Sequence, residues 1–325
     1  MEQNYTESGA AIAEGTSAAA EVTPVAKRSL KKFLFKKYQI HGLIWLLPAF
    51  VLLVMFCYIP QIWAVVYSFT DWGVFQNISF TGLENYIRLF GDTAFWESFG
   101  NVILFTVCGL ILGNVGSLSL AEMLYNMKNE KLASAFRYCF MLICVVPSVV
   151  SVLVWEKVIF LPDTAVTEGV ANSILHLFGL QGSQWYSSPE TIKLTIILTG
   201  FPFMGGTSFL IYLAGLQGIN VSVVEASKLD GLTSFGRIFR IDLPLMKGQI
   251  KYFLITGVIG GIQNYNMQLI LQNGNAAMVP GFYIYKMGID YSEFGYACSL
   301  GVMIFVITLV LTVIGNVFFK TKEKD

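Results

Sequence analysis

The chain has 325 residues, of which 55% are hydrophobic and only 13% are charged, and 21 basic residues balance 21 acidic ones. Soluble domains carry about 25% charged residues, and the mean hydropathy of +0.62 lies far on the apolar side. The composition therefore excludes an ordinary soluble protein and predicts an all-α integral membrane protein.

The N-terminal segment differs from the rest of the chain. Residues 1–26 are rich in Ala, Glu, Ser and Thr and have no periodic apolar face, so they bury too little surface to offset the entropy of ordering. We expect residues 1–38 to be a disordered cytoplasmic tail that ends in a basic juxtamembrane segment. Because the basic cluster follows the tail and leads into a long apolar stretch, the N-terminal segment is not predicted to be a cleavable signal peptide.

Residues 39–322 are predicted to form one transmembrane domain. Apolar stretches long enough to cross about 30 Å of hydrocarbon as a helix predict about six spans, at residues 42–69, 98–121, 138–160, 191–217, 252–272 and 296–319. Basic residues near span ends are retained in the cytoplasm. With the N-terminus inside, every Lys and Arg falls on a cytoplasmic segment except Arg88, Lys157, Lys193 and Lys286. Both termini are therefore expected to be cytoplasmic.

The fourth span contains a motif that should bend its helix. Residues 201–207 read Phe-Pro-Phe-Met-Gly-Gly-Thr, in which the proline removes a hydrogen bond of the ladder and two glycines weaken the next turn. Carbonyl groups and aromatic rings released at this bend are expected to line a cavity. The candidate residues for a substrate path are Phe203, Gly206 and Thr207.

A charged segment at residues 218–250 separates the fourth span from the fifth, and a partner protein is expected to dock there. Ser222 and Glu225 match a capping box, which predicts that a helix starts at Ser222. Gly231 has no Cβ and is suited to the left-handed conformation that ends a helix.

A second helical stretch is predicted from about Thr233 to just before Pro244, because a proline disfavours helical backbone in the residue before it. Two short helices joined at a glycine would form a compact knob. Its apolar surface, which could insert into a groove on a soluble partner, is predicted to be Val223, Val224, Ala226 and Leu229.

Amides gather in the fifth span, whereas the middle of every predicted span is nearly free of charged side chains. One helix face is predicted to carry Gly257, Gly261, Asn264 and Gln268. Amides donate to and accept from hydroxyl groups, so this face suits a neutral polyol or saccharide. An ion pathway would instead show buried charges. The alternative is that these small and polar residues pack helices together, as they often do in membranes.

No catalytic, metal or nucleotide site is predicted. The five cysteines fall within spans and are interpreted as small apolar packing residues, and His41 and His176 are too isolated in the sequence to suggest a metal site. Residues 231–238 have the glycine spacing of a phosphate-binding loop but lack its Lys and its Ser or Thr. The chain is therefore expected to be non-enzymatic and to hold no cofactor.

The segment at residues 218–250 resembles the cytoplasmic loop signature of ABC importer permeases, roughly Glu-Ala-Ala, three residues, Gly, and later Ile-x-Leu-Pro. Ser227 replaces the second alanine, and the matching residues are Glu225, Ala226, Asp230, Gly231, Ile241, Leu243 and Pro244. Further segments resemble the carbohydrate branch of these permeases, including the larger permease of maltose-type importers: residues 47–49, 58–60, 67–72, 80–86, 213–217, Ile219 and 294–297. The chain departs from that branch after Gly274, where a second glycine and a proline are common.

The resemblance implies a permease subunit of an ATP-driven importer in the cell (inner) membrane, which moves a sugar or oligosaccharide into the cytoplasm. Its partners would be a second homologous permease chain in a heterodimer, two ABC ATPase domains that bind ATP and Mg²⁺, and an extracytoplasmic solute-binding protein, with no nucleic acid. We call residues 218–250 the coupling loop. The implied ATPase-coupling residues are Glu225, Ala226, Ser227, Asp230, Gly231, Leu243 and Pro244.

Other functions stay open at this point. A permease of the same superfamily for a polyol phosphate or a polyamine would call for basic or acidic residues within the spans. An ion-coupled secondary transporter would show an ion site and inverted repeats, and a membrane-embedded enzyme would show a nucleophile, a base or a metal cluster. The charge-poor spans favour the sugar importer over all three.

Overall fold

The computed structural model describes residues 37–73, 78–164, 167–203, 206–271 and 275–318. The chain divides into two compact units, Met1–Ile59 and Pro60–Asp325. Residues 1–36 of the predicted tail and Gly274 of the last outer loop lie outside the described residues. Residues 37 and 38, which were expected to belong to the tail, are the first two of a helix.

The described part of the first unit is helical. Helix α2 (Lys37–Leu53) contains Pro48 and continues into the π turn η1 (Val54–Tyr58). Its large apolar side chains from Ile44 onward, such as Trp45 and Phe56, are exposed. A helix that is apolar all round is typical of a segment that lies in a membrane or is covered by other helices.

The second unit is built from helices of unequal length. The first helices of this unit are α3 (Ile59–Tyr67, which begins one residue before the unit), α4 (Glu84–Gly91) and the long helix α5 (Thr93–Tyr125). The middle of the chain forms α6 (Glu130–Leu142), η2 (Ile143–Val145), α7 (Ser148–Val154), η3 (Trp155–Ile159), α8 (Val170–Leu177), η4 (Trp185–Ser187), α9 (Ile192–Leu198) and α10 (Gly206–Gln217).

The coupling loop and the last spans follow. They comprise α11 (Val221–Leu229), α12 (Ser234–Arg237), η5 (Ile238–Asp242), α13 (Leu243–Leu245), α14 (Lys247–Gln263), α15 (Asn266–Leu271), η6 (Asn275–Ala277), α16 (Pro280–Tyr285), η7 (Lys286–Asp290) and α17 (Phe294–Phe318). Among the described residues, the one extended pairing is the isolated bridge between Thr70 and Phe80.

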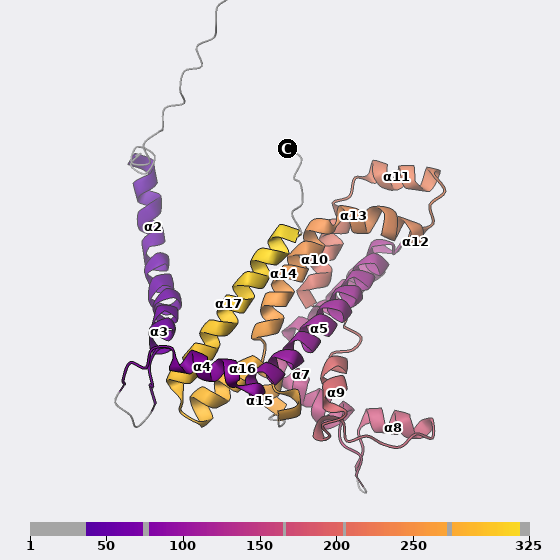
Figure 1. Ribbon diagram of the computed structural model, residues 1–325. Coiled ribbons are helices and arrows are strands. Elements are labelled where there is room, and N and C mark those ends of the chain that lie inside the picture. Colours follow the sequence, from indigo (N-terminus) through magenta and orange to yellow (C-terminus); the bar gives the residue numbers. More distant parts are fainter. Residues whose placement is uncertain (1–36, 74–77, 165–166, 204–205, 272–274, 319–325) are drawn as a thin grey trace, which may run out of the picture. The chain divides into compact units, whose positions relative to one another are not determined.

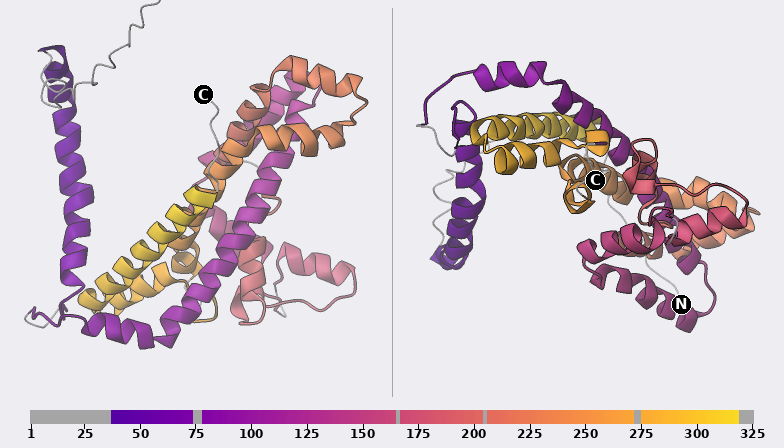
Figure 2. Two further views of the ribbon diagram at one scale, coloured as in Figure 1. Left: turned by 45° about the horizontal axis from the view of Figure 1, so that its top comes forward. Right: turned by 90° about the horizontal axis from the view of Figure 1, so that it is seen from below.

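Helix α5 is central to the second unit, because it packs against α10 and α14, and α14 in turn packs against α17 (Figure 1). Helices α11 and α12 lie beyond the last turn of α5, while α4 and α16 lie near its first turn, as the turned views in Figure 2 also show. Clusters of buried apolar residues surround both ends of α5. One joins α5 to α16 and α17 around Phe95 and Leu300, and another joins α5 to α10 around Leu120 and Phe209.

Within the described residues, three helices are long and apolar enough to cross a membrane by themselves: Ile44–Tyr67, Thr93–Tyr125 and Phe294–Val317. The number rises to five if two bent helix pairs each count as one span, namely Glu130–Val145 with Ser148–Ile159 and Gly206–Gln217 with Val221–Leu229. The count of six remains a prediction.

The third and fifth predicted spans, residues 138–160 and 252–272, are each interrupted and do not form one continuous helix. The chain turns by 94° between α6 and α7, where Val146 before Pro147 adopts extended backbone, as residues before a proline commonly do. Helix α14 ends at Gln263, and the next residue, Asn264, also has extended backbone. The Asn264 side-chain oxygen accepts a hydrogen bond from the Asn266 amide, and such local bonds compete with the helix ladder.

Candidate functional site

A cavity of about 540 Å³ lies between α5, α14, the start of α10 and the break before α10. None of the described residues that line it carries a charge. They are Phe105, Thr106, Gly109, Leu110, Gly113, Asn114, Ser117, Phe203, Ser208, Phe253, Thr256, Gly257, Gly261 and Asn264. The volume falls within the range of small-molecule sites. Aromatic rings, amides and hydroxyls on one surface are suited to a neutral ligand that carries hydroxyl groups.

Three polar side chains of this cavity, Asn114, Ser117 and Ser208, take part in hydrogen bonds between α5 and α10. The Tyr212 hydroxyl donates to the Asn114 side-chain oxygen at 2.5 Å, and the hydroxyls of Ser117 and Ser208 lie 2.7 Å apart. These contacts hold α5 against α10. The buried hydroxyl of Thr106 has no hydrogen-bond partner within the described structure, and it faces Gly261 of α14.

Several of the sequence-predicted path residues meet at this cavity and others do not. Phe203, Gly257, Gly261 and Asn264 line it, whereas Gly206, Thr207 and Gln268 are not among its lining residues. The prediction that positions 257, 261, 264 and 268 share one helix face was wrong. Because α14 ends at Gln263, Gln268 belongs to the separate helix α15, where it is buried.

The two glycines of α14 are already used in helix packing. A Cβ at Gly257 would lie 2.4 Å from the Leu110 side chain, and a Cβ at Gly261 would lie 2.6 Å from two atoms of Thr106. Real Cβ contacts are never this short, so α14 approaches α5 closely only because both positions are glycine. The glycine face that the sequence predicted for a ligand is therefore partly covered by side chains of α5.

The break between α9 and α10 brings Phe203 to the cavity. The Phe201–Pro202 peptide bond is cis, and Phe203 has a φ of 61°. Residues other than glycine seldom adopt this left-handed backbone, and where they do they often lie at functional sites. Gly116 permits the arrangement, since a Cβ there would lie 2.5 Å from the Phe203 carbonyl oxygen.

Sequence reasoning missed the wall that α5 provides. Small and polar residues recur along α5 at helical spacing, and those on the cavity side are Thr106, Gly109, Gly113, Asn114 and Ser117. Spacing of three or four residues places them on one face, and small residues at such spacing mark close helix contacts in membranes. This signal was present in the second predicted span and could have identified the wall.

The coupling loop folds into two short helices, although the first begins differently from the prediction. Asn220, not Ser222, caps α11, because the Asn220 side-chain oxygen accepts from the Ser222 amide at 3.0 Å. The Ser222 hydroxyl donates to the same oxygen. The capping-box prediction was therefore wrong. Asparagine is as good a cap as serine, and here it lies one residue before the helix.

Gly231 ends α11 as predicted. Its φ is 75°, and the Gly231 amide donates to the Lys228 carbonyl at 3.1 Å while the Leu232 amide donates to the Ser227 carbonyl at 3.0 Å. This pair of bonds is the Schellman arrangement, in which a left-handed glycine follows the last helical turn. The chain then turns back sharply enough to place α12 alongside α11 (Figure 1).

The second helical stretch begins as predicted and continues further. The Thr233 hydroxyl accepts from the Gly236 amide at the start of α12, but the helical backbone does not end before Pro244. Leu243 is helical, and its amide donates to the Ile238 carbonyl five residues earlier, within the π turn η5. A π turn changes the register of the ladder. Pro244 is therefore tolerated within the first turn of α13.

The outward surface of α11 carries most, but not all, of the predicted docking residues. Leu229 is 89% exposed, and Val223, Glu225, Ala226, Lys228 and Asp230 are also exposed. Val224, by contrast, is buried in the apolar cluster that joins α5 to α10, so its inclusion in the docking surface was wrong. Ser227 is buried as well, and its hydroxyl donates to the Val224 carbonyl at 2.6 Å.

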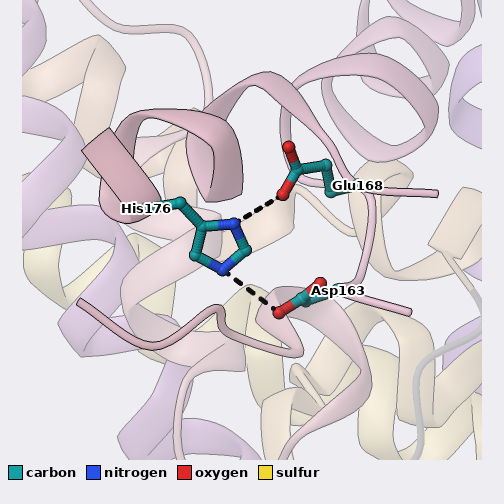
Figure 3. A group of neighbouring side chains, drawn as sticks. All are labelled: Asp163, Glu168 and His176. Carbon is teal, nitrogen blue, oxygen red and sulfur yellow. Dashed lines mark ion pairs between the residues drawn. The ribbon is translucent and has the colours of Figure 1, made fainter. Parts of the chain in front are cut away.

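A third group of polar side chains lies in the segment between η3 and α9. His176 contacts Glu168 through Nδ1 at 2.7 Å and Asp163 through Nε2 at 3.4 Å. One atom from each residue lies within 4.8 Å of the others, so the three are close enough to be considered for a metal ion. Figure 3 shows the two carboxylates at opposite nitrogens of the ring. The imidazole therefore bridges two acids, and the three side chains do not converge on one point.

Comparisons with known proteins identify the family to which the chain belongs. Residues 113–323 match the family described as "Binding-protein-dependent transport system inner membrane component". The lactose transport system permease LacF of Rhizobium radiobacter is 29% identical over 308 residues, which cover 92% of this chain and 98% of LacF. The arabinooligosaccharide transport system permease AraP of Bacillus subtilis is 30% identical, over 73% of this chain and 75% of AraP.

The fold is also that of a solved transporter subunit. A chain in the crystal structure of a bacterial ABC transporter involved in import of the acidic polysaccharide alginate has a TM-score of 0.77 and 22% identity, over 91% of this chain and 99% of that one. The family match covers more than half of the chain, and its members are transport subunits and not enzymes. The chain therefore belongs to the family of inner-membrane components of binding-protein-dependent transport systems.

Proposed function

We propose that this chain is one of two permease subunits of an ATP-driven importer that moves a neutral saccharide or oligosaccharide into the cytoplasm. Family membership supports the role of a transport subunit. The observation that carries the choice of substrate is the uncharged wall of the cavity, where Asn114, Thr256 and Asn264 lie among aromatic rings. Amides and hydroxyls can both donate to and accept from sugar hydroxyls.

Two relatives support a sugar, since LacF is a lactose permease and AraP an arabinooligosaccharide permease. The similar alginate importer handles an acidic polysaccharide. An acidic ligand would favour Lys or Arg in the cavity wall, and the described lining residues of this chain include neither. For the same reason a polyol phosphate is disfavoured, and a polyamine would require acidic residues there.

The coupling loop is proposed to dock on an ABC ATPase, which binds ATP and Mg²⁺ for the complex. The exposed surface of α11, with Leu229 at its end, supports this role. Glu225, Ala226, Ser227, Asp230, Gly231, Leu243 and Pro244 remain the proposed coupling residues. Because most basic residues flank the same predicted end of the spans, we propose that both termini and this loop face the cytoplasm.

The substrate path is proposed to run along the cavity, with Phe203, Gly257, Gly261 and Asn264 in its wall. The extracytoplasmic binding protein would deliver the sugar at the end where α4 and α16 lie, opposite the coupling loop (Figure 1). In this scheme ATP binding brings the two coupling loops of the heterodimer together and opens the cavity outward. Hydrolysis then returns it to the cytoplasmic side.

The proposal is tested by purifying the chain from its native membrane in mild detergent and identifying stoichiometric partners by mass spectrometry. We expect a second permease chain and an ATPase. The complex is then reconstituted in liposomes with the binding protein, and ATP-dependent uptake of a neutral disaccharide is compared with that of a uronic acid oligosaccharide. A homodimer that transports without ATP would refute the importer, and uptake of the acidic sugar alone would refute the neutral substrate.

A further inference from the structure

A buried ion pair lies inside the coupling loop. The Arg237 Nε donates to the Asp242 Oδ2 at 2.9 Å, and the two side chains are only 7% and 0% exposed. Arg237 ends α12 and Asp242 ends η5, so the pair holds this helical stretch in one conformation. Such a pair costs much desolvation energy and is often retained for the geometry that it enforces.

The same guanidinium reaches out of the loop to helix α5. Its Nη2 donates to the Asn126 side-chain oxygen at 2.7 Å, and it lies 5.4 Å from the centre of the Tyr125 ring. The Asn126 side-chain nitrogen donates to the Glu122 carboxylate at 3.2 Å and to the Glu122 carbonyl at 2.8 Å. Arg237 is therefore bound at once to the coupling loop and to the last turn of α5.

Helix α5 continues without a break from this contact to the cavity. Asn114, which lies in the cavity wall, is twelve residues before Asn126, a distance of about 18 Å along a helix. Tyr212 and Ser208 hold the same part of α5 against α10. A displacement of the coupling loop that carries Arg237 would therefore shift the cavity wall through one rigid element.

The charges of this cluster make Arg237 hard to replace. Two carboxylates of the cluster are buried: Asp242 pairs with the guanidinium directly, and Glu122 is linked to it through the Asn126 amide. One oxygen of each carboxylate is buried without a hydrogen-bond partner in the described structure. Removal of Arg237 would leave these acids uncompensated. Loss of Asn126 would instead break the link to α5 and leave the Arg237–Asp242 pair intact.

We propose that Arg237 is a positioning residue that couples the ATPase-docking loop to the substrate cavity, through Asn126 and the rigid helix α5. This inference rests on the proposed function. In this proposal Asn126 and Arg237 transmit movement between the two sites, and neither residue contacts the ATPase or the sugar. Coupling between two sites is a free energy that acts in both directions. The link should therefore transmit the effect of the loaded binding protein on ATP hydrolysis as well as the effect of ATP on the cavity.

The test uses the full reconstituted complex with an Asn126→Ala chain, and Lys128→Ala serves as the matched control because Lys128 is exposed and lies two residues away. Four quantities are measured: co-purification of the ATPase, basal ATP hydrolysis, stimulation of hydrolysis by the sugar-loaded binding protein, and sugar uptake. We expect Asn126→Ala to assemble and to hydrolyse ATP at the basal rate. Its stimulation and uptake should fall about tenfold, within the usual range of allosteric coupling.

A purely structural role would give a different pattern, in which assembly, basal hydrolysis and thermal stability fall together. That pattern, or full stimulation and uptake in Asn126→Ala, overturns the proposal. Asn126→Gln is a second variant, because its amide keeps an oxygen that can accept from Arg237 and a nitrogen that can donate to Glu122, and it should recover more coupling than Asn126→Ala. If the wild-type complex shows no ATP-dependent uptake, the proposed function itself fails. If the wild type and Asn126→Ala both show full stimulation and uptake, only the inference is refuted and the proposed function stands.

Discussion

The hydroxyl of Tyr296 donates a hydrogen bond of 2.6 Å to the carboxylate of Asp92, which joins α17 to the start of α5. The same carboxylate accepts a bond of 2.6 Å from the Tyr283 hydroxyl of α16. It also caps α5 by accepting from the Phe95 amide at 3.2 Å. Asp92 therefore ties three helices together at the end of α5 that is remote from the coupling loop.

Replacement of Asp92 by alanine should destabilise the second unit. The change removes an N-cap, which contributes about 1 kcal/mol, and two hydrogen bonds to a charged group, which contribute about 1.5–3 kcal/mol each when fully buried. Because Asp92 is only partly buried, we expect the free energy of unfolding to fall by about 2–3 kcal/mol. The measurement is the apparent melting temperature in detergent. Glu190→Ala, at an exposed acidic residue, should leave it unchanged, and an equally stable Asp92→Ala would contradict this account.

Stability should also depend on pH through Asp92. Partial desolvation acts to raise the pKa of Asp92, but hydrogen bonds from Tyr283, Tyr296 and the Phe95 amide outweigh it and hold the pKa below the ordinary 3.8. A carboxyl with a lowered folded-state pKa contributes stability above its unfolded pKa and loses it as pH falls through the folded value.

The expected result is that wild type is more stable than Asp92→Asn at pH 6, and that this difference shrinks below about pH 4. Melting temperatures of both proteins over pH 3–7 provide the check. Parallel curves over the whole range would show that the Asp92 charge does not contribute, because the Asn variant has no carboxyl to titrate at this position.

Gly231→Ala should disturb the coupling loop. A side chain at a φ of 75° costs about 1–2 kcal/mol, which would loosen the Schellman turn and shift α12 relative to α11. We expect weaker co-purification of the ATPase and reduced uptake. Gly248→Ala is the control, because a Cβ at Gly248 meets nothing within 4 Å. Equal behaviour of the two variants would show that the left-handed turn is not required.

Much of the coupling loop could be predicted from its sequence, because local chemistry determines it. Gly231 ends α11 as a left-handed glycine should, and Thr233 begins the next helix. The errors have local causes too. Asn220 competes with Ser222 for the cap, and the π turn η5 accommodates Pro244, which simple helix rules do not anticipate.

The cavity was less predictable, because it depends on contacts between segments far apart in the chain. Hydropathy identified the apolar stretches but could not show that Asn264 interrupts the fifth one. Nor could it show that Leu110 and Thr106 of α5 occupy the space beside Gly257 and Gly261. Periodicity assigns a residue to a face, whereas the partner of that face follows from packing between helices.

The two interpretations of Gly261, close helix packing or approach of a ligand, predict different results. Gly261→Ala should lower the melting temperature, because the new Cβ would lie 2.6 Å from Thr106 Cγ2 and Oγ1, and overpacking of this kind costs about 1–3 kcal/mol. Gly260→Ala on the same helix meets nothing within 4 Å and is the matched control.

The decisive variant combines Gly261→Ala with Thr106→Ala, which removes both clashing atoms. Residues in contact deviate from additivity, so the double variant should regain most of the stability that Gly261→Ala loses. If Gly261 serves only helix packing, the double variant regains both stability and sugar uptake. If the glycine backbone also lies in the sugar path, stability returns and uptake stays low. Measurement of both quantities on the four proteins, wild type, the two single variants and the double variant, therefore assigns Gly261 to the helix contact or to the transport path.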